Sequence, residues 1–176
     1  MKYEDIKKPL ELYNFIKDNF TYGFYSKNHD KCFTRDILKE NYETTLFNNY
    51  CLQTPAELLQ RKVGLCYDFV EFEKDWLLKH NYKVYTYYTK HHNHAFLVYV
   101  DNGYNLFETT YDRINGIHNE KTLEDIKNYI IKNQKNNIKL YEFSNPIFGS
   151  DFYQFVYNIT KDKKYIEEIR NKYKVD

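Results

Sequence analysis

Cys66 has the residue type and the position best suited to covalent chemistry. It follows Gly64 and Leu65 and opens a predicted helix that runs to Lys79. The first turn of a helix presents unpaired N–H groups and a partial positive charge, and both favour a thiolate, which is the reactive form of cysteine. The position therefore predicts a reactive thiol. A small buried side chain, the usual state of a free cysteine, is the structural alternative.

His94 is the candidate partner of that thiol. It opens the predicted strand 94–100, and a helix that precedes an antiparallel sheet can place its N-terminus against such a strand. A cysteine nucleophile needs a base or an imidazolium, which the fold brings close. His91 and His92 lie just before it in a predicted turn and raise the alternative of a metal site. Because no further ligand of the expected kind lies nearby in the sequence, we expect no bound metal.

Glu108, on the following predicted strand, is the candidate for orienting the imidazole, as a catalytic triad requires. The hairpin turn decides whether it can do so. A two-residue loop at 102–103 would send Glu108 and His94 to opposite faces of the sheet. A three-residue loop at 101–103, with Gly103 left-handed, would make them diagonal neighbours on one face. The triad therefore predicts the three-residue turn, whereas a solvated strand carboxylate is the structural alternative for Glu108.

The elements that must position these residues follow from hydrophobic periodicity. Helical spacing of apolar residues predicts helices over 3–19, 34–40, 55–63, 66–79, 122–133, from 150 onward and over 165–173. Segments rich in Val, Tyr, Phe and Thr predict strands over 82–90, 94–100, 104–111 and 138–143. Residues 20–34 mix Gly, Asn and Asp with aromatic residues and are predicted to form a loop. This order indicates an α+β fold in one domain over 1–176.

Two helix boundaries carry recognisable end signals. Thr54, Pro55 and Glu57 form a helix start, with Thr as the N-cap, Pro at the first helical position and Glu at the third. The helix that begins at Cys66 is expected to stop near Asn81, because Asn tolerates the left-handed conformation found after helix ends. The chain around the thiol is thus expected to run helix, turn, helix and then sheet.

Composition narrows the function classes. The formal net charge is +1, from 26 Lys and Arg against 25 Asp and Glu, so nucleic acid is not a favoured partner. No apolar run is long enough to span a bilayer and the N-terminus lacks the apolar stretch of a signal peptide, so we expect a cytoplasmic protein with no membrane partner. The other two cysteines, Cys32 and Cys51, lie at spacings that match no zinc or redox motif and are interpreted as structural or incidental thiols.

These motifs together resemble the transglutaminase-like superfamily. Its members typically show G-x-C-x-D at a helix start, H-A on a strand and an acidic residue on the next strand; here the corresponding segments are 64–68, 94–95 and 107–110. The upstream TPAELL segment resembles the helix that often precedes the cysteine. The resemblance covers roughly residues 50–112 and implies a papain-like core, in which the central helix that bears the cysteine packs on a three- or four-stranded antiparallel sheet with flanking helices.

The resemblance also implies roles for the residues. Cys66 would be the nucleophile, His94 the general acid and base, and Glu108 the orienting residue. Family members usually carry Asp at the third position, and Glu is one methylene longer; Asp112, which has the same strand parity, is the other candidate for orienting the ring.

An acyl-transfer site also needs an oxyanion hole. The backbone N–H of Cys66 can supply one donor. The second usually comes from a side chain upstream of the cysteine, and we consider Gln53 first and Tyr50 second.

The function expected from the sequence is thiol-dependent acyl transfer on peptide or protein amides, of the peptidase, amidase or deamidase type, without a cofactor. Hydrolysis is favoured over cross-linking by analogy, because a small chain lacks the accessory domains of the large cross-linking transglutaminases. A catalytically inactive binding module for a peptide or protein partner, on the same fold, is the alternative from a different class. A metal-dependent hydrolase that uses the histidine cluster is a further alternative.

Overall fold

The computed structural model describes residues 2–28, 30–34, 42–134 and 138–173. Within them the α-helices are α1 (Pro9–Asn19), α2 (Tyr42–Asn49), α3 (Pro55–Arg61), α4 (Cys66–Lys79), α5 (Leu123–Asn133), α6 (Phe152–Thr160) and α7 (Lys163–Lys172). The strands are β1 (Thr21–Tyr25), β2 (Cys32–Thr34), β3 (Val63–Gly64), β4 (Lys83–Thr89), β5 (His94–Val100), β6 (Tyr104–Glu108), β7 (Gly116–Glu120) and β8 (Leu140–Phe143). Three short 3-10 turns are η1 (Tyr3–Asp5), η2 (His91–Asn93) and η3 (Asp112–Ile114).

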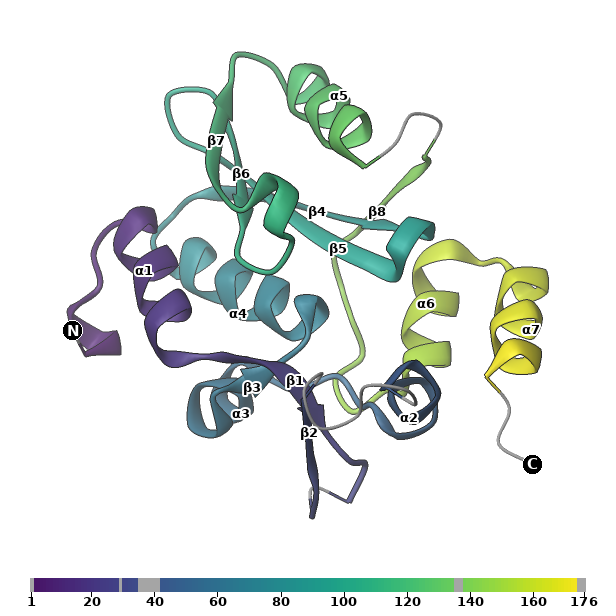
Figure 1. Cartoon of the computed structure of the whole chain (residues 1–176). Helices are drawn as coiled ribbons and strands as arrows, with labels where there is room; N and C mark the ends of the chain where they lie inside the picture. Colours follow the sequence, from purple (N-terminus) through teal and green to yellow (C-terminus); the bar gives the residue numbers. More distant parts are fainter. Residues whose placement is uncertain (1, 29, 35–41, 135–137, 174–176) are drawn as a thin grey trace.

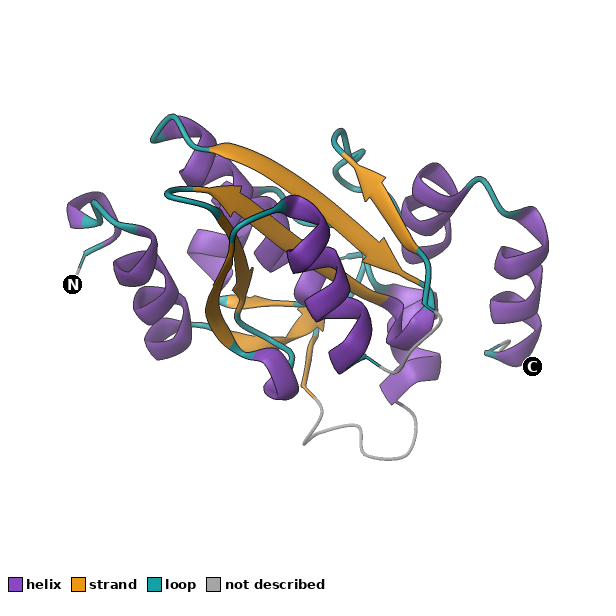
Figure 2. Ribbon diagram, turned by 90° about the horizontal axis from the view of Figure 1, so that it is seen from above, coloured by secondary structure: helices purple, strands orange, loops and turns teal. Residues whose placement is uncertain are grey.

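The main sheet has five antiparallel strands in the order β7-β6-β5-β4-β8, with β5 at its centre (Figure 1). Helix α4 packs on one face through Phe69, Phe72 and Trp76, whose side chains are almost fully buried. Helix α5 covers the other face, where Ile126 and Ile130 pack against the even-numbered residues of β5. Figure 2, viewed from above, shows α5 lying across the strands. The α+β architecture expected from the sequence is confirmed, with a sheet one strand larger than the expected maximum of four.

Helix α4 begins at Cys66 and ends at Lys79, as the periodicity predicts, and Asn81 after it is left-handed with φ 65°. Helix α3 also starts as predicted. The Thr54 hydroxyl accepts a hydrogen bond from Glu57 N at 3.2 Å, and the Glu57 carboxylate accepts one from Thr54 N at 2.8 Å. This reciprocal capping satisfies two N–H groups that the helix itself cannot pair.

The hairpin between β5 and β6 has the three-residue turn that the triad requires. Val100 pairs with Tyr104, so residues 101–103 form the loop. Gly103 has φ +126°, and a Cβ on it would lie 2.7 Å from the Glu120 carbonyl oxygen, so the position requires glycine. The register places His94 and Glu108 at the same end of the sheet, on one face.

The prediction of a loop over residues 20–34 is wrong. Strand β1 pairs in parallel with β3 and antiparallel with β2, which makes a second, three-stranded sheet. Strand β3 is only two residues long and far away in the chain, so local sequence pattern does not reveal the pairing. A Cβ on Gly23 would lie 2.5 Å from the Phe33 carbonyl oxygen, so this glycine, which suggested a loop, instead allows close approach of two strands.

Other boundaries also differ from the prediction. The first predicted helix, 3–19, is divided into η1 and α1 because Pro9 disfavours helical backbone at Lys8. The predicted strand 104–111 ends at Glu108, whose carboxylate accepts hydrogen bonds from the next backbone N–H groups and bends the chain away. Helix α2 and strand β7 were not predicted, and the predicted helix 34–40 lies almost entirely outside the described residues.

No helix within the described segments combines the length and apolar composition needed to cross a bilayer. The core is rich in aromatic side chains, and Tyr50, Tyr87 and Tyr88 are among its largest fully buried members.

Candidate active site

Cys66 is the first residue of α4 and is 2% exposed. Its position is held by Asp68, a buried carboxylate one half-turn along the helix. Asp68 Oδ2 accepts a hydrogen bond from Leu65 N at 2.8 Å, and its Oδ1 accepts hydrogen bonds from Gln53 N at 2.9 Å and Tyr50 Oη at 3.0 Å. One side chain therefore caps the helix and joins its start to the segment that precedes α3.

Gly64 allows this arrangement because a larger residue would not fit beside the start of α4. A Cβ on Gly64 would lie 2.6 Å from Leu58 Cδ1 and 3.0 Å from Asp68 Cβ. The G-x-C-x-D pattern therefore has a physical basis here: the glycine admits the carboxylate, and the carboxylate caps the turn that carries the thiol.

His94 begins β5 and Glu108 ends β6, and the two side chains meet. His94 Nε2 lies 2.8 Å from Glu108 Oε2. Both residues are buried: His94 is 6% exposed and Glu108 is 3% exposed. The other carboxylate oxygen, Oε1, accepts hydrogen bonds from Thr110 N at 2.7 Å, Thr110 Oγ1 at 2.9 Å and Tyr111 N at 2.9 Å. Because every one of these groups can donate, the carboxylate is held in one orientation and in its charged form.

The electrostatics of the pair follow from burial and mutual charge. Burial lowers the pKa of His94, but the charges of Glu108 and of a Cys66 thiolate, and hydrogen bonds to both side chains, outweigh it and raise this pKa from 6.5 to about 10. Burial raises the pKa of Glu108, yet the His94 charge and the Thr110 hydrogen bonds bring it below its usual value of 4.5. Both shifts favour an imidazolium beside a carboxylate.

The thiol of Cys66 lies against the same imidazole. The sulfur is close enough to the ring to raise its pKa, and because Nε2 of the ring faces Glu108, Nδ1 is the nitrogen available to the sulfur. The sulfur also lies 3.9 Å from the Asn93 carbonyl oxygen. A helix-opening sulfur, an imidazole and a carboxylate from three elements thus form a continuous chain of contacts, a geometry suited to thiolate chemistry.

The two oxyanion candidates hold other groups. Gln53 Nε2 donates to the Val63 carbonyl at 2.9 Å and its Oε1 accepts from Arg61 at 3.1 Å, while the Tyr50 hydroxyl donates to Asp68. Both side chains therefore stabilise the approach to α4 in this structure, rather than pointing a free donor at the site. Asp112 is exposed, and of the two acidic candidates it is Glu108 that contacts the His94 ring.

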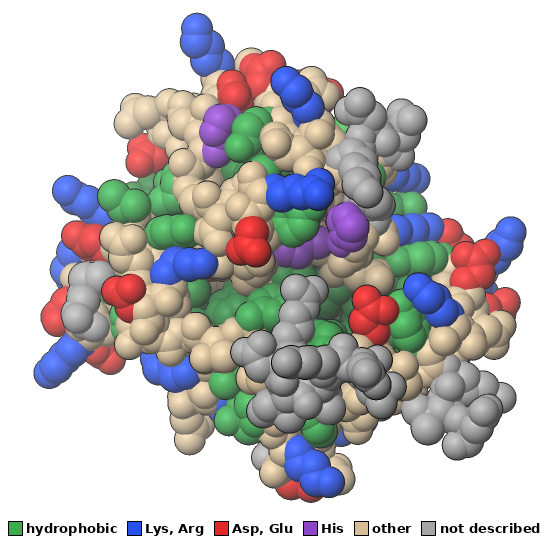
Figure 3. All heavy atoms as spheres, viewed as in Figure 1, with side chains coloured by type: hydrophobic (Ala, Val, Ile, Leu, Met, Phe, Trp, Pro, Cys, Tyr) green, Lys and Arg blue, Asp and Glu red, His purple; other side chains and the backbone are tan. Residues whose placement is uncertain are grey.

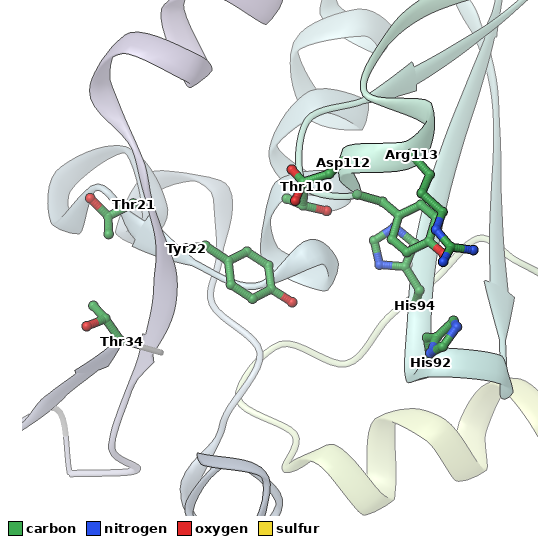
Figure 4. Close-up of a pocket in the computed structure, with 9 residues that line it drawn as sticks. Thr21, Tyr22, Thr34, His92, His94, Thr110, Asp112 and Arg113 are labelled. Atoms are coloured by element: carbon green, nitrogen blue, oxygen red, sulfur yellow. The ribbon is translucent and has the colours of Figure 1, made fainter. Parts of the chain in front are cut away.

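A pocket of about 620 Å³ opens beside the imidazole (Figure 4). Its lining comes from β1, β2, η2, β5 and the segment after β6, and consists of Thr21, Tyr22, Thr34, His92, His94, Thr110, Tyr111, Asp112 and Arg113. Figure 3 shows histidine side chains at the edge of a hollow floored by hydrophobic side chains. In Figure 4 the Tyr22 ring extends into the hollow toward His94, and Arg113 approaches from the opposite wall.

Four residues that line the pocket are not among those predicted from the sequence: Tyr22, Thr110, Tyr111 and Arg113. The sequence pattern predicts a loop where β1 lies, so it gives no sign that Tyr22 faces the pocket. Thr110 follows Glu108 by two residues, and a hydroxyl at that distance is a common partner for a carboxylate in a turn. The sequence therefore contains a signal from which the Thr110 contact could be predicted. The Tyr111 ring lies with its centroid 5.4 Å from that of His94 and covers it from solvent.

A second buried carboxyl group, Glu73 on α4, lies close behind the pair. It accepts a hydrogen bond from Thr109 Oγ1 at 2.9 Å and is 1% exposed. Burial raises its pKa well above 4.5, and the negative charge of Glu108 raises it further. The raised pKa favours the neutral form of Glu73, which avoids a second negative charge beside that of Glu108.

No group of three or more His, Cys, Asp or Glu side chains in the described part of the chain is arranged to hold a metal ion. All three cysteines are free thiols, and Cys32 and Cys51 are only half-buried. Cys32 lies on β2 and Cys51 lies just before α3.

Comparison with known proteins gave one match. A family model described as a transglutaminase-like domain matches residues 1–142. This range includes Cys66, His94 and Glu108. Searches of curated proteins and of solved structures gave no match. The matched range ends within β8, so α6 and α7 lie beyond it.

Proposed function

The chain belongs to the transglutaminase-like domain family, and we propose that it is a thiol-dependent acyl-transfer enzyme that acts on peptide or protein amide bonds. In this proposal Cys66 is the nucleophile, His94 the general acid and base, and Glu108 the orienting residue. The observation that carries it is the buried 2.8 Å contact between His94 and Glu108, beside a thiol at a helix start.

The chemistry follows from these positions. The Cys66 thiolate attacks the amide carbonyl carbon, and the oxyanion that forms lies near the backbone N–H groups at the start of α4. The His94 imidazolium gives its proton to the leaving amine nitrogen as the C–N bond breaks, which leaves a thioester on Cys66. Water then attacks the thioester, His94 takes up a proton from it, and the acid product and the thiolate are released.

Glu108 contributes by stabilising the positive charge on His94 and by keeping Nε2 directed away from the thiol. Its longer side chain, compared with the Asp usual in the family, is accommodated because three donors of the following turn hold its second oxygen. The departure from the usual residue is thus compatible with a working triad.

Hydrolysis is the outcome that we propose for the acyl-enzyme, giving a peptidase, amidase or deamidase; attack by a lysine amine would give a cross-link instead. The peptide or protein nature of the substrate and a cytoplasmic location are likewise proposals. Incubation of the protein with a panel of peptide amides in the presence and absence of a primary amine separates the two reactions, since hydrolysis gives acid product and transamidation gives the amine conjugate.

A substrate-independent test uses the three thiols of the chain. Brief treatment with iodoacetamide at pH 7, followed by mass spectrometry of peptides, should alkylate Cys66 at least about tenfold faster than Cys32 or Cys51, because only the first has an imidazolium partner. His94→Gln should remove that advantage. Equal, slow alkylation of all three thiols in the unmodified protein would contradict the proposal and favour an inactive binding module on the same fold.

A further inference from the structure

Asn93, the residue before His94, is held by three tyrosines from three different elements. Its carbonyl oxygen accepts a hydrogen bond from Tyr67 Oη of α4. Its side-chain oxygen accepts hydrogen bonds from Tyr88 Oη of β4 at 2.7 Å and from Tyr165 Oη of α7 at 2.6 Å. Two of these donors reach the side chain of Asn93 and the third reaches its backbone carbonyl.

The backbone of this turn needs such restraint. His92 and Asn93 are both left-handed, with φ 64° and φ 48°, and neither is glycine. Consecutive non-glycine residues in this conformation are costly and persist only where surrounding contacts hold them. The hydrogen bonds at Asn93 are the contacts that do so next to the imidazole.

Asn93 also touches the thiol. Its carbonyl oxygen, which receives the Tyr67 hydroxyl, lies 3.9 Å from Cys66 Sγ. A displacement of this residue would therefore change both the direction in which β5 presents His94 and the contact that the sulfur makes on its other side.

Helix α7 reaches this turn through two residues. Asp162, its N-cap, pairs with Lys90, and the Lys90 ammonium lies 4.6 Å above the centre of the Tyr165 ring. The Tyr165 hydroxyl oxygen also lies 3.3 Å from the Lys90 carbonyl oxygen. Figure 1 shows α6 and α7 beside the end of the sheet where η2 connects β4 to β5. These helices lie beyond residues 1–142, the range that matches the family.

We propose that Asn93 is a positioning residue for the Cys66–His94 pair, and that α7 completes the active site by holding it through Tyr165. This inference rests on the proposed function, since a positioning role presupposes a reactive pair. It assigns a catalytic contribution to a helix that is not part of the family's matched domain.

The test compares two matched tyrosine variants. Tyr165→Phe removes the hydroxyl that donates to Asn93 and leaves the ring packing intact. Tyr173→Phe removes a hydroxyl from the C-terminal end of the same helix, where it donates to Glu43 Oε2 at 2.7 Å, far from the pair. Each variant loses one tyrosine hydroxyl that ties the α7 segment to another part of the chain, so an effect on stability alone should be similar in the two variants.

The readout is the rate at which iodoacetamide alkylates Cys66, measured as a function of pH together with the thermal midpoint of unfolding. We expect Tyr165→Phe to slow alkylation at pH 7 by about fivefold, the equivalent of one hydrogen bond, and to shift the rate profile to higher pH. Tyr173→Phe should change neither the alkylation rate at pH 7 nor its pH profile. Asn93→Gly, which tolerates the left-handed backbone but lacks the side-chain acceptor, should reproduce the Tyr165→Phe result without unfolding.

Two contrary results are distinguishable. If Cys66 of the unmodified protein reacts no faster than the other thiols, the proposed function itself fails. If Cys66 is fast, and Tyr165→Phe and Asn93→Gly match the unmodified protein or Tyr173→Phe slows the rate equally, the function stands and the positioning role is overturned.

Discussion

At the scale of single residues, the site depends on one carboxylate, that of Glu108, which accepts the hydrogen bonds of the turn that follows β6. Glu108 receives the His94 ring on one oxygen and three donors from Thr110 and Tyr111 on the other. The same contacts end β6, so the strand boundary and the orientation of the imidazole have a common cause. Glu108 therefore acts on the His94 ring through its charge as well as through its shape.

Replacing Glu108 by Gln keeps the shape and removes the charge. Without the carboxylate the imidazolium is less stable, so less of the thiolate–imidazolium pair exists at pH 7. We expect Glu108→Gln to slow alkylation of Cys66 by about tenfold or more, the effect of one pKa unit on the ring. Rates from the same mass-spectrometric assay provide the measurement.

Asp112→Asn is the matched control, since it neutralises the other acidic candidate, which is exposed on the pocket wall. It should change the rate by much less than Glu108→Gln. A larger effect on the rate from Asp112→Asn than from Glu108→Gln would show that Asp112, and not Glu108, orients the His94 ring.

The grouping of Cys66, His94 and Glu108 could be predicted from the sequence because local pattern reports the position of each residue. Cys66 is placed by helix periodicity after a glycine, and His94 and Glu108 are brought to one face by a turn whose length Gly103 specifies. The oxyanion candidates could not be placed in this way. Gln53 and Tyr50 lie at the right point of the chain, yet their hydrogen bonds to Val63 and Asp68 depend on how α3 packs beside α4.

At the scale of elements, the start of α4 is a junction of three segments. Asp68 joins it to the chain before α3, and Gly64 provides the space for that carboxylate. The neighbouring β3 is two residues long and is held by β1, a strand from the opposite side of the pocket. The segment that leads into Cys66 is thus paired directly with the strand that forms one wall of the pocket.

Gly64→Ala tests this junction. The added methyl group would meet Leu58 Cδ1 at 2.6 Å and Asp68 Cβ at 3.0 Å, so we expect the free energy of unfolding to fall by about 1–3 kcal/mol, the usual cost of overpacking. Urea unfolding followed by tryptophan fluorescence measures it. Leu58→Val in the same chain should recover part of the loss, because it retracts the atom that clashes; no recovery would place the strain elsewhere.

The elements that the sequence failed to predict are those stabilised by distant partners. Strand β1 depends on β2 and β3, and β7 is an edge strand whose residues are mostly half-buried and lack strong alternation. Helix α4 and strands β4 to β6, by contrast, carry continuous buried faces that give a clear period. Long-range pairing is the part of the fold that local pattern cannot report.

At the scale of the whole molecule, a helix and a sheet hold Cys66 and His94, while flanking elements complete their surroundings. The five-stranded sheet separates two hydrophobic clusters, one under α4 and one under α5, and the site lies at the end of the sheet where β5 begins. Strand β1 from the N-terminal part supplies a pocket wall, and α7 from the C-terminal part reaches the turn before His94. The site therefore draws on segments from both ends of the chain.

The measurement that tests the central claim most directly is the titration of the His94 ring by NMR. With the Cys66 sulfur and the Glu108 carboxylate beside its two nitrogens, the ring should remain protonated at pH 8 and lose its proton only as the pH rises through about 10. Cys66→Ala should move this titration to lower pH, because one of the two negative charges is gone. A ring that titrates near its ordinary value of 6.5, and does so equally in Cys66→Ala, would contradict the existence of the pair.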